Sequence, residues 1–167
     1  MLRLGGLLYG FSIPIKTIFS SYFMKIILDT NFLIYCAKEK IDYVEKLQSM
    51  FHEHFDLVVP EQVIEELDVV MNKKKTKIPF VRRTARFKKT TGRDKEAASL
   101  ALQIVEKYIS EKIISIVKAE GNTVDEALIN LAQENKKNIV CTLDREMRET
   151  LGRVVLMNKN KQLILSR

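Results

Sequence analysis

Cysteine, proline, glycine and tryptophan are all scarce in this chain of 167 residues. It has two Cys, three Pro, six Gly and no Trp, which excludes a disulfide-rich or collagen-like fold. Cys36 and Cys141 lie far apart in the sequence with no His beside either, so a Cys/His zinc site is excluded as well. No apolar run reaches about 18 residues, so a membrane-spanning helix is not expected. The two unpaired thiols fit a reducing, cytoplasmic location.

The chain has enough apolar material for a hydrophobic core. Hydrophobic residues make up 46% and charged residues 29%, and the length predicts a single domain. Residues 1–23 are apolar but have neither a helical nor a strand period, and they lack a signal-peptide cleavage pattern. Met24 then opens a compact strand, MKIILDTN. We therefore expect residues 1–23 to be a dispensable extension and residues 24–167 to form the domain.

One stretch of the chain is strongly basic. Between Asn72 and Lys95 there are eleven Lys and Arg residues and one acid, Asp94, whereas the whole chain has a net charge of +7. This basic strip therefore carries +10 and the remainder −3. A concentrated cationic segment on a mildly acidic body favours a polyanion partner over a merely solvated loop. The candidate RNA contacts are Lys73, Lys74, Lys75, Lys77, Arg82, Arg83, Arg86, Lys88 and Lys89.

Short β-branched runs alternate with segments of helical spacing along residues 24–167. The predicted strands are Ile26–Leu28, Leu57–Val59, Ile113–Val117, Ile139–Cys141 and Val154–Met157. Continuous apolar strands between amphipathic helices are typical of a parallel sheet covered on both faces. We therefore predict an α/β fold, a three-layer α/β/α domain with a central parallel sheet.

Acidic side chains follow four of these strands, where functional groups of such sheets gather. They are Asp29, Glu65–Glu66, Asp125–Glu126 and Asp144. At about 100° per residue, Glu66 borders the apolar stripe of its helix and Glu65 faces solvent. Asp125 borders its stripe in the same way. Glu126 completes a T-x-x-E capping box with Thr123 and so has a structural role.

Each acid taken singly has a structural explanation. Asp29 and Asp144 could cap the following helices, and Glu66 could be a surface residue. Four carboxylates at one edge, however, repel one another unless cations or protons intervene. An oxygen-only donor set suits Mg²⁺ or Mn²⁺, which can promote phosphodiester hydrolysis. Asp29, Glu66, Asp125 and Asp144 are the predicted catalytic and metal-binding residues.

The stretches MKIILDTNFLIYCA, VVPEQVIEEL, GNTVDEALINLA and VCTLDREMRETL resemble the PIN-domain ribonucleases, over essentially Met24 to the C-terminus. The resemblance implies a PIN-like fold and places the family's metal-binding acids on the same four residues. It also places Asn31 and Thr142 at positions that support the metal site. Its implied activity is endonucleolytic cleavage of RNA.

Two roles within this family remain open. The VPEQVIEEL motif, the following NKKKTK and the C-terminal RVVLMNKNKQLIL resemble archaeal proteins similar to the rRNA-processing PIN nuclease. The alternative is a VapC-type toxin, for which an antitoxin partner is expected. A homodimer is compatible with both roles, and no membrane partner is expected.

Two functions outside this family would each account for part of the sequence pattern. A non-catalytic RNA-binding module would explain the basic strip but not four converging acids. An aspartyl-nucleophile phosphatase needs a second acid two residues after the first, where this chain has Asn31.

Overall fold

The computed structural model describes residues 23–72 and 92–166, which contain one six-stranded sheet. The strands lie side by side in the order β3-β2-β1-β4-β5-β6. Their bounds are β1 Met24–Leu28, β2 Phe55–Pro60, β3 Ile114–Val117, β4 Ile139–Cys141, β5 Val154–Met157 and β6 Leu163–Leu165. The first five strands are parallel to their neighbours, and β6 is antiparallel to β5.

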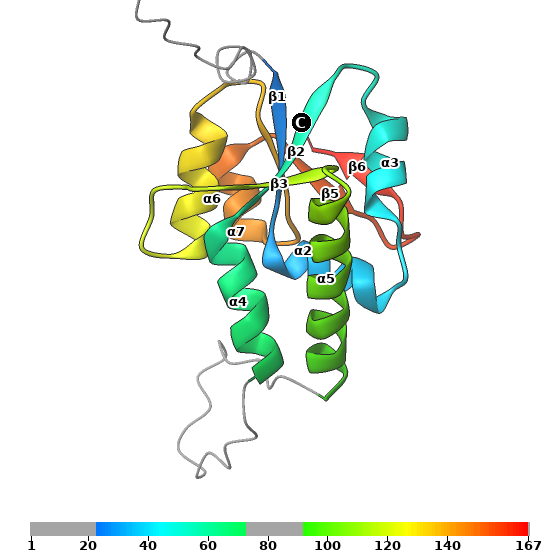
Figure 1. The fold of residues 1–167 in the computed structure, drawn as a ribbon. Helices are drawn as coiled ribbons and strands as arrows, with labels where there is room; N and C mark the ends of the chain where they lie inside the picture. Colours follow the sequence, from blue (N-terminus) through cyan, green and yellow to red (C-terminus); the bar gives the residue numbers. More distant parts are fainter. Residues whose placement is uncertain (1–22, 73–91, 167) are drawn as a thin grey trace, which may run out of the picture.

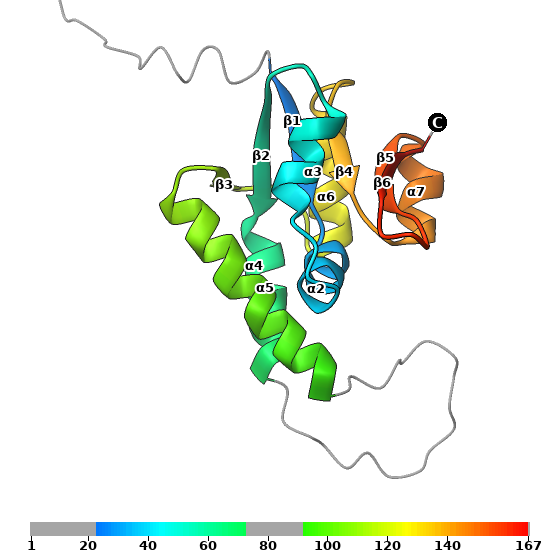
Figure 2. The same ribbon diagram turned by 90° about the vertical axis from the view of Figure 1, so that its right-hand side faces the viewer.

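Helices cover both faces of this sheet. Their bounds are α2 Thr30–Lys38, α3 Tyr43–Met50, α4 Glu61–Asn72, α5 Gly92–Ser110, α6 Val124–Gln133 and α7 Arg145–Leu151. Figure 1 shows α6 and α7 on one side of the strands and α3 and α5 on the other. Helix α4 packs lengthwise against α5 below the carboxyl ends of the strands (Figure 2). The predicted three-layer α/β/α fold is therefore confirmed.

The two central strands are buried along their whole predicted length. Ile26–Leu28 in β1 and Ile139–Cys141 in β4 are all completely inaccessible to solvent. Strands covered on both faces need apolar side chains at every position, and this is why these runs show no alternation.

Helix α5 departs from its predicted pattern at Leu100. The helical spacing of its apolar residues predicts that Leu100 lies on the buried face, but this side chain is 42% exposed.

The sixth strand is the main departure from the predicted fold, because the sheet is not wholly parallel. Residues 158–162 form a tight turn in which the Asn158 side chain accepts hydrogen bonds from the backbone amides of Asn160 and Gln162. A connection this short can only join antiparallel strands. The apolar part of β6 is three residues long and follows a polar run, so its sequence pattern is too short to predict a strand.

Two sets of predictions fall on residues outside the described ranges. They concern the extension, apart from Phe23, and nearly all of the basic strip. Within the described residues, no helix is both long and apolar enough to cross a membrane.

Candidate active site

The carboxyl ends of β1 and β4 lie next to each other at the centre of the sheet. This is the point where the strand order reverses, because β2 and β3 extend to one side and β4 to β6 to the other. Crevices at such points are the usual ligand sites of open α/β sheets. Asp29 directly follows β1, and its backbone amide donates to the carbonyl of Cys141 at 3.1 Å. Thr142 follows β4, so these two residues are brought together by strand pairing.

Asp29 is a buried carboxylic acid with 2% of its surface exposed. It occupies the N-cap position of α2, yet its side chain forms no capping hydrogen bond. Its Oδ2 instead accepts a hydrogen bond of 2.8 Å from the Thr142 hydroxyl. The carboxylate is therefore bound by a residue outside α2, while the backbone of Asn31 within α2 also favours its ionised form.

The surroundings of Asp29 raise its pKa from 3.8 to about 6. Burial is the main cause, because it removes water from the ionised form. The hydrogen bond from Thr142 opposes this rise, and the negative charges of Asp125 and Glu66 add to it. Three acids from three separate elements thus lie close enough to influence one another.

Asp144 is half-buried and caps α7. Its Oδ1 accepts a hydrogen bond of 2.7 Å from the backbone amide of Glu146, as the structural explanation of this residue requires. Its own backbone amide donates to the Thr142 hydroxyl at 3.0 Å. Capping occupies one carboxylate oxygen of Asp144 and leaves its negative charge beside the site.

Asp125 lies in the first turn of α6, on the exposed surface. Partial burial is the main cause of its raised pKa, and the charges of Asp144, Glu66 and Glu146 raise the pKa further. Its neighbour Glu126 has the predicted structural role: its backbone amide donates to Thr123 Oγ1 at 3.2 Å. The Glu126 carboxylate accepts from the amide of Asn122 at 2.8 Å, one residue before the usual capping-box partner.

Glu66 and Glu65 differ as helical phasing predicts. Glu66 is half-buried on α4 and its charge acts on both Asp29 and Asp125, whereas Glu65 is exposed. Asn31 is exposed in the first turn of α2. A hydrogen bond from its backbone favours the ionised form of Asp29 and so lowers the pKa of that carboxyl.

Glu146 is an acid of this region that sequence reasoning missed. Its charge raises the pKa of Asp125, and it lies in the first turn of α7. First-turn acids are common for reasons of helix electrostatics alone, so position in the sequence gives no reason to single it out. Glu146 lies two residues after Asp144, one of the predicted acids, and this spacing is the sequence signal that could have identified it.

The acids form an open cluster. Over residues 23–72 and 92–166, no three His, Cys, Asp or Glu side chains lie close enough to hold a metal ion together. Their charges nevertheless raise the pKa values of Asp29 and Asp125. The arrangement is therefore a concentration of negative charge in which the carboxylates have not converged.

The nine candidate RNA contacts, from Lys73 to Lys89, lie outside the described residues. The strip joins the end of α4 at Asn72 to the start of α5 at Gly92, and these two helices lie side by side (Figures 1 and 2). Near its far end, Asp94 forms an ion pair of 3.6 Å with Lys38 of α2.

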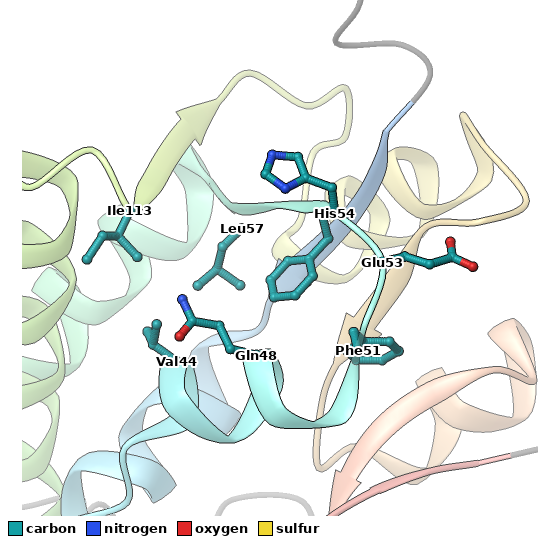
Figure 3. A pocket seen from close by; sticks show the side chains of 8 residues that line it. Val44, Gln48, Phe51, Glu53, His54, Leu57 and Ile113 are labelled. Atoms are coloured by element: carbon teal, nitrogen blue, oxygen red, sulfur yellow. The ribbon is translucent and has the colours of Figure 1, made fainter.

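A separate hollow of about 330 Å³ lies at the opposite, amino-terminal edge of the sheet (Figure 3). It is lined by Val44, Gln48, Phe51, Glu53, His54, Phe55, Leu57 and Ile113. None of the four predicted acids lines this hollow, so it is not part of the acidic site.

Comparisons with known proteins agree on one family. The family model described as "PIN like domain" matches residues 26–159. Ribonuclease VapC4 of Methanocaldococcus jannaschii is 32% identical over 127 residues, covering 76% of this chain and 82% of that protein. The PIN domain endonuclease Utp24 is a similar solved structure, with a TM-score of 0.59 and 18% identity over 86% of this chain and 91% of that chain. At that identity the structural match concerns the fold alone.

Proposed function

Because this chain belongs to the PIN-like domain family, we propose that it is a divalent-cation-dependent endoribonuclease whose catalytic acids are Asp29, Glu66, Asp125 and Asp144. The observation that carries the proposal is the state of Asp29. This carboxyl is buried at the strand-order reversal, with a pKa raised to about 6, and the charges of Glu66 and Asp125 contribute to the rise. Perturbed acids gathered from several elements are typical of functional sites.

The donor chemistry of these residues fits Mg²⁺ or Mn²⁺. All four proposed ligands are carboxylates, and hard oxygen donors are what both ions prefer. A cation would also relieve the repulsion that now raises the pKa values of Asp29 and Asp125. Since the carboxylates do not converge in the described arrangement, binding requires their side chains to move closer together.

Neighbouring residues orient the proposed ligands. Thr142 orients the Asp29 carboxylate, and the α7 cap fixes Asp144. Asn31 is proposed as a further supporting residue at the mouth of the site. At neutral pH most Asp29 side chains are ionised, so they are available as ligands. A bound divalent cation supplies activation of water and stabilisation of the leaving oxygen of the phosphodiester.

We further propose that the basic strip binds the phosphates of RNA through its nine candidate contacts, from Lys73 to Lys89. A cluster of acids repels a polyanion, so a cationic surface is needed to bring the substrate to it. The strip leaves α4 about two turns after Glu66, on the helix that carries one of the proposed ligands. Residues 24–167 are proposed as the nuclease domain, a range that includes the family match.

The test is cleavage of a fluorescent single-stranded RNA by the full chain in Mg²⁺, in Mn²⁺ and in EDTA. We expect fragments only with a divalent cation and none with Asp29→Asn. Equal cleavage in EDTA would contradict the cation-dependent mechanism, and RNA binding without cleavage would favour a non-catalytic module.

A second candidate is the VapC-type toxin role, and the relative that favours it is Ribonuclease VapC4. Sequence motifs instead resemble the RNA-processing members. Inducible expression in bacterial cells separates the two roles. A toxin should arrest growth in the wild type but not in Asp29→Asn, and co-expression of the protein encoded immediately upstream should restore growth. Unimpaired growth with active enzyme would favour RNA processing.

A further inference from the structure

Gln62 connects two of the elements that carry the proposed acids. It lies in the first turn of α4, and its Nε2 donates a hydrogen bond of 2.7 Å to the backbone carbonyl of Ala119. Ala119 belongs to residues 118–123, the loop between β3 and α6. This β3–α6 loop leads directly to Asp125, whereas α4 carries Glu66. One side chain therefore ties the Glu66 helix to the loop that places Asp125.

The pairing of β2 with β3 brings Gln62 and the β3–α6 loop together. Pro60 at the end of β2 is paired with Val117 at the end of β3, so α4 and the β3–α6 loop start side by side. Helices α4 and α6 then pack against each other (Figure 1). Gln62 and Glu66 are four residues apart and so lie on the same face of α4. Gln62 contacts the loop from this face, and the Glu66 charge acts on Asp125.

The β3–α6 loop is held firmly on its other side by α6 itself. Asn130 Nδ2 donates to the carbonyl of Glu120 at 2.8 Å, and Glu126 accepts from the amide of Asn122. Gly121 has a φ of +149°, and a Cβ at this position would lie 2.5 Å from the backbone nitrogen of Ala127. The loop and α6 thus form one unit, and Gln62 holds that unit to α4.

Only one atom of the Gln62 amide connects it to another element. Its Nε2 forms the bond to Ala119, whereas its Oε1 is buried and has no hydrogen-bond partner among the described residues. Gln62 therefore acts on the β3–α6 loop through this single bond.

We propose that Gln62 is a positioning residue that sets the separation of Glu66 from Asp125 and thereby the affinity of the site for a divalent cation. This inference rests on the proposed function. Ligands held by different elements bind a cation well only when those elements are fixed relative to each other.

The first test measures the separation of α4 and α6 directly, without cation or RNA. Spin labels are attached to the full chain at Asp68→Cys and Gln133→Cys, two exposed positions on these helices, while Cys36 and Cys141 are buried. Pulsed electron spin resonance should give a broader or longer distance distribution in Gln62→Met than in the wild type. The matched control is Asn130→Leu, which loses a hydrogen bond within the loop–α6 unit and should leave the distribution unchanged.

The second test measures Mn²⁺ affinity by the electron spin resonance of the free ion. Gln62→Met should weaken binding by about threefold to tenfold, as expected for the loss of one hydrogen bond, and Asn130→Leu by less than twofold. Cleavage by Gln62→Met should recover at saturating Mn²⁺ with an unchanged KM for RNA. If Gln62→Met does not fold, Gln62→Asn, which is too short to reach Ala119, should give the same shifts.

Three results would overturn the inference. They are an unchanged label distance, an altered distance with unchanged Mn²⁺ affinity, and equal weakening in Asn130→Leu. Failure of the proposed function has a different signature, because the wild type would then bind no Mn²⁺ and cleave no RNA.

Discussion

The hydroxyl of Thr142 donates a hydrogen bond of 2.8 Å to the carboxylate of Asp29, 113 positions earlier in the chain. The same oxygen accepts a bond of 3.0 Å from the backbone amide of Asp144. A backbone amide can only donate, so Thr142 accepts from Asp144 and keeps its own hydroxyl proton for the Asp29 carboxylate. Thr142 therefore links two of the four proposed catalytic acids through one hydroxyl group.

Replacing Thr142 with Val should damage the site more than replacing it with Ser. Val keeps the shape but leaves the Asp29 carboxylate and the Asp144 amide without their partner. We expect a loss of about 1–3 kcal/mol in the free energy of unfolding and a cation affinity lower by about 10-fold or more. Urea unfolding and Mn²⁺ titration measure these two effects. Ser retains the hydroxyl and should stay near the wild type, and equal losses in both variants would show that the methyl group matters instead.

The raised pKa of Asp29 predicts a pH-dependent difference between the wild type and Asp29→Asn in the absence of cations. Between pH about 4 and about 6 the folded chain holds a proton that the unfolded chain releases. The free energy of unfolding of the wild type therefore falls as the pH rises through this range, by as much as about 3 kcal/mol. Asp29→Asn has no such titration, so its stability relative to the wild type should increase from pH 4 to pH 7.

Urea unfolding in a chelating buffer at several pH values measures this difference. Glu106→Gln, an exposed substitution on α5, is the control and should show no such trend. Adding Mg²⁺ should restore stability to the wild type but not to Asp29→Asn. A difference that does not vary with pH would contradict an elevated Asp29 pKa.

The neighbouring acids on α4 and α6 give matched pairs for activity. Glu66→Gln and Asp125→Asn should each lower kcat by at least about 100-fold, because each removes one of the proposed ligands of the divalent cation. Glu65→Gln should stay within about twofold of the wild type, since Glu65 is exposed. Glu126→Gln should too, because an amide oxygen can still accept the hydrogen bond from Asn122. If Glu65→Gln were as damaging as Glu66→Gln, the assignment of the α4 face would be wrong.

The basic strip predicts a salt dependence of RNA binding. Contact with about five phosphates of single-stranded RNA gives a slope of log K against log[salt] near −3.5, from about −0.7 per contact. Replacing Lys73, Lys74, Lys75 and Lys77 with Gln should flatten this slope and weaken RNA binding, with little change in Mn²⁺ affinity. The control replaces four exposed lysines elsewhere, Lys40, Lys112, Lys136 and Lys159. The same slope in both quadruple variants would show that RNA is bound by other residues.

The sequence by itself determined five of the six strands, the α/β class and the different orientations of Glu65 and Glu66. Strands with both faces buried have apolar residues throughout, and helices have a stripe every 3.6 residues, so local patterns are enough to assign β1, β4 and the faces of Glu65 and Glu66. The capping box of Thr123 and Glu126 is likewise local, because it spans four residues.

Only the tertiary structure decided the contacts between distant segments. Burial of Asp29 and its bond to Thr142 depend on the pairing of β1 with β4, which no local pattern specifies. The proximity of Glu146 to Asp125 and the contact of Gln62 with Ala119 depend on how α4, α6 and α7 pack around the sheet. A pKa or a cross-chain hydrogen bond reflects what surrounds a group in space, and folding brings those surroundings from segments that the sequence keeps apart.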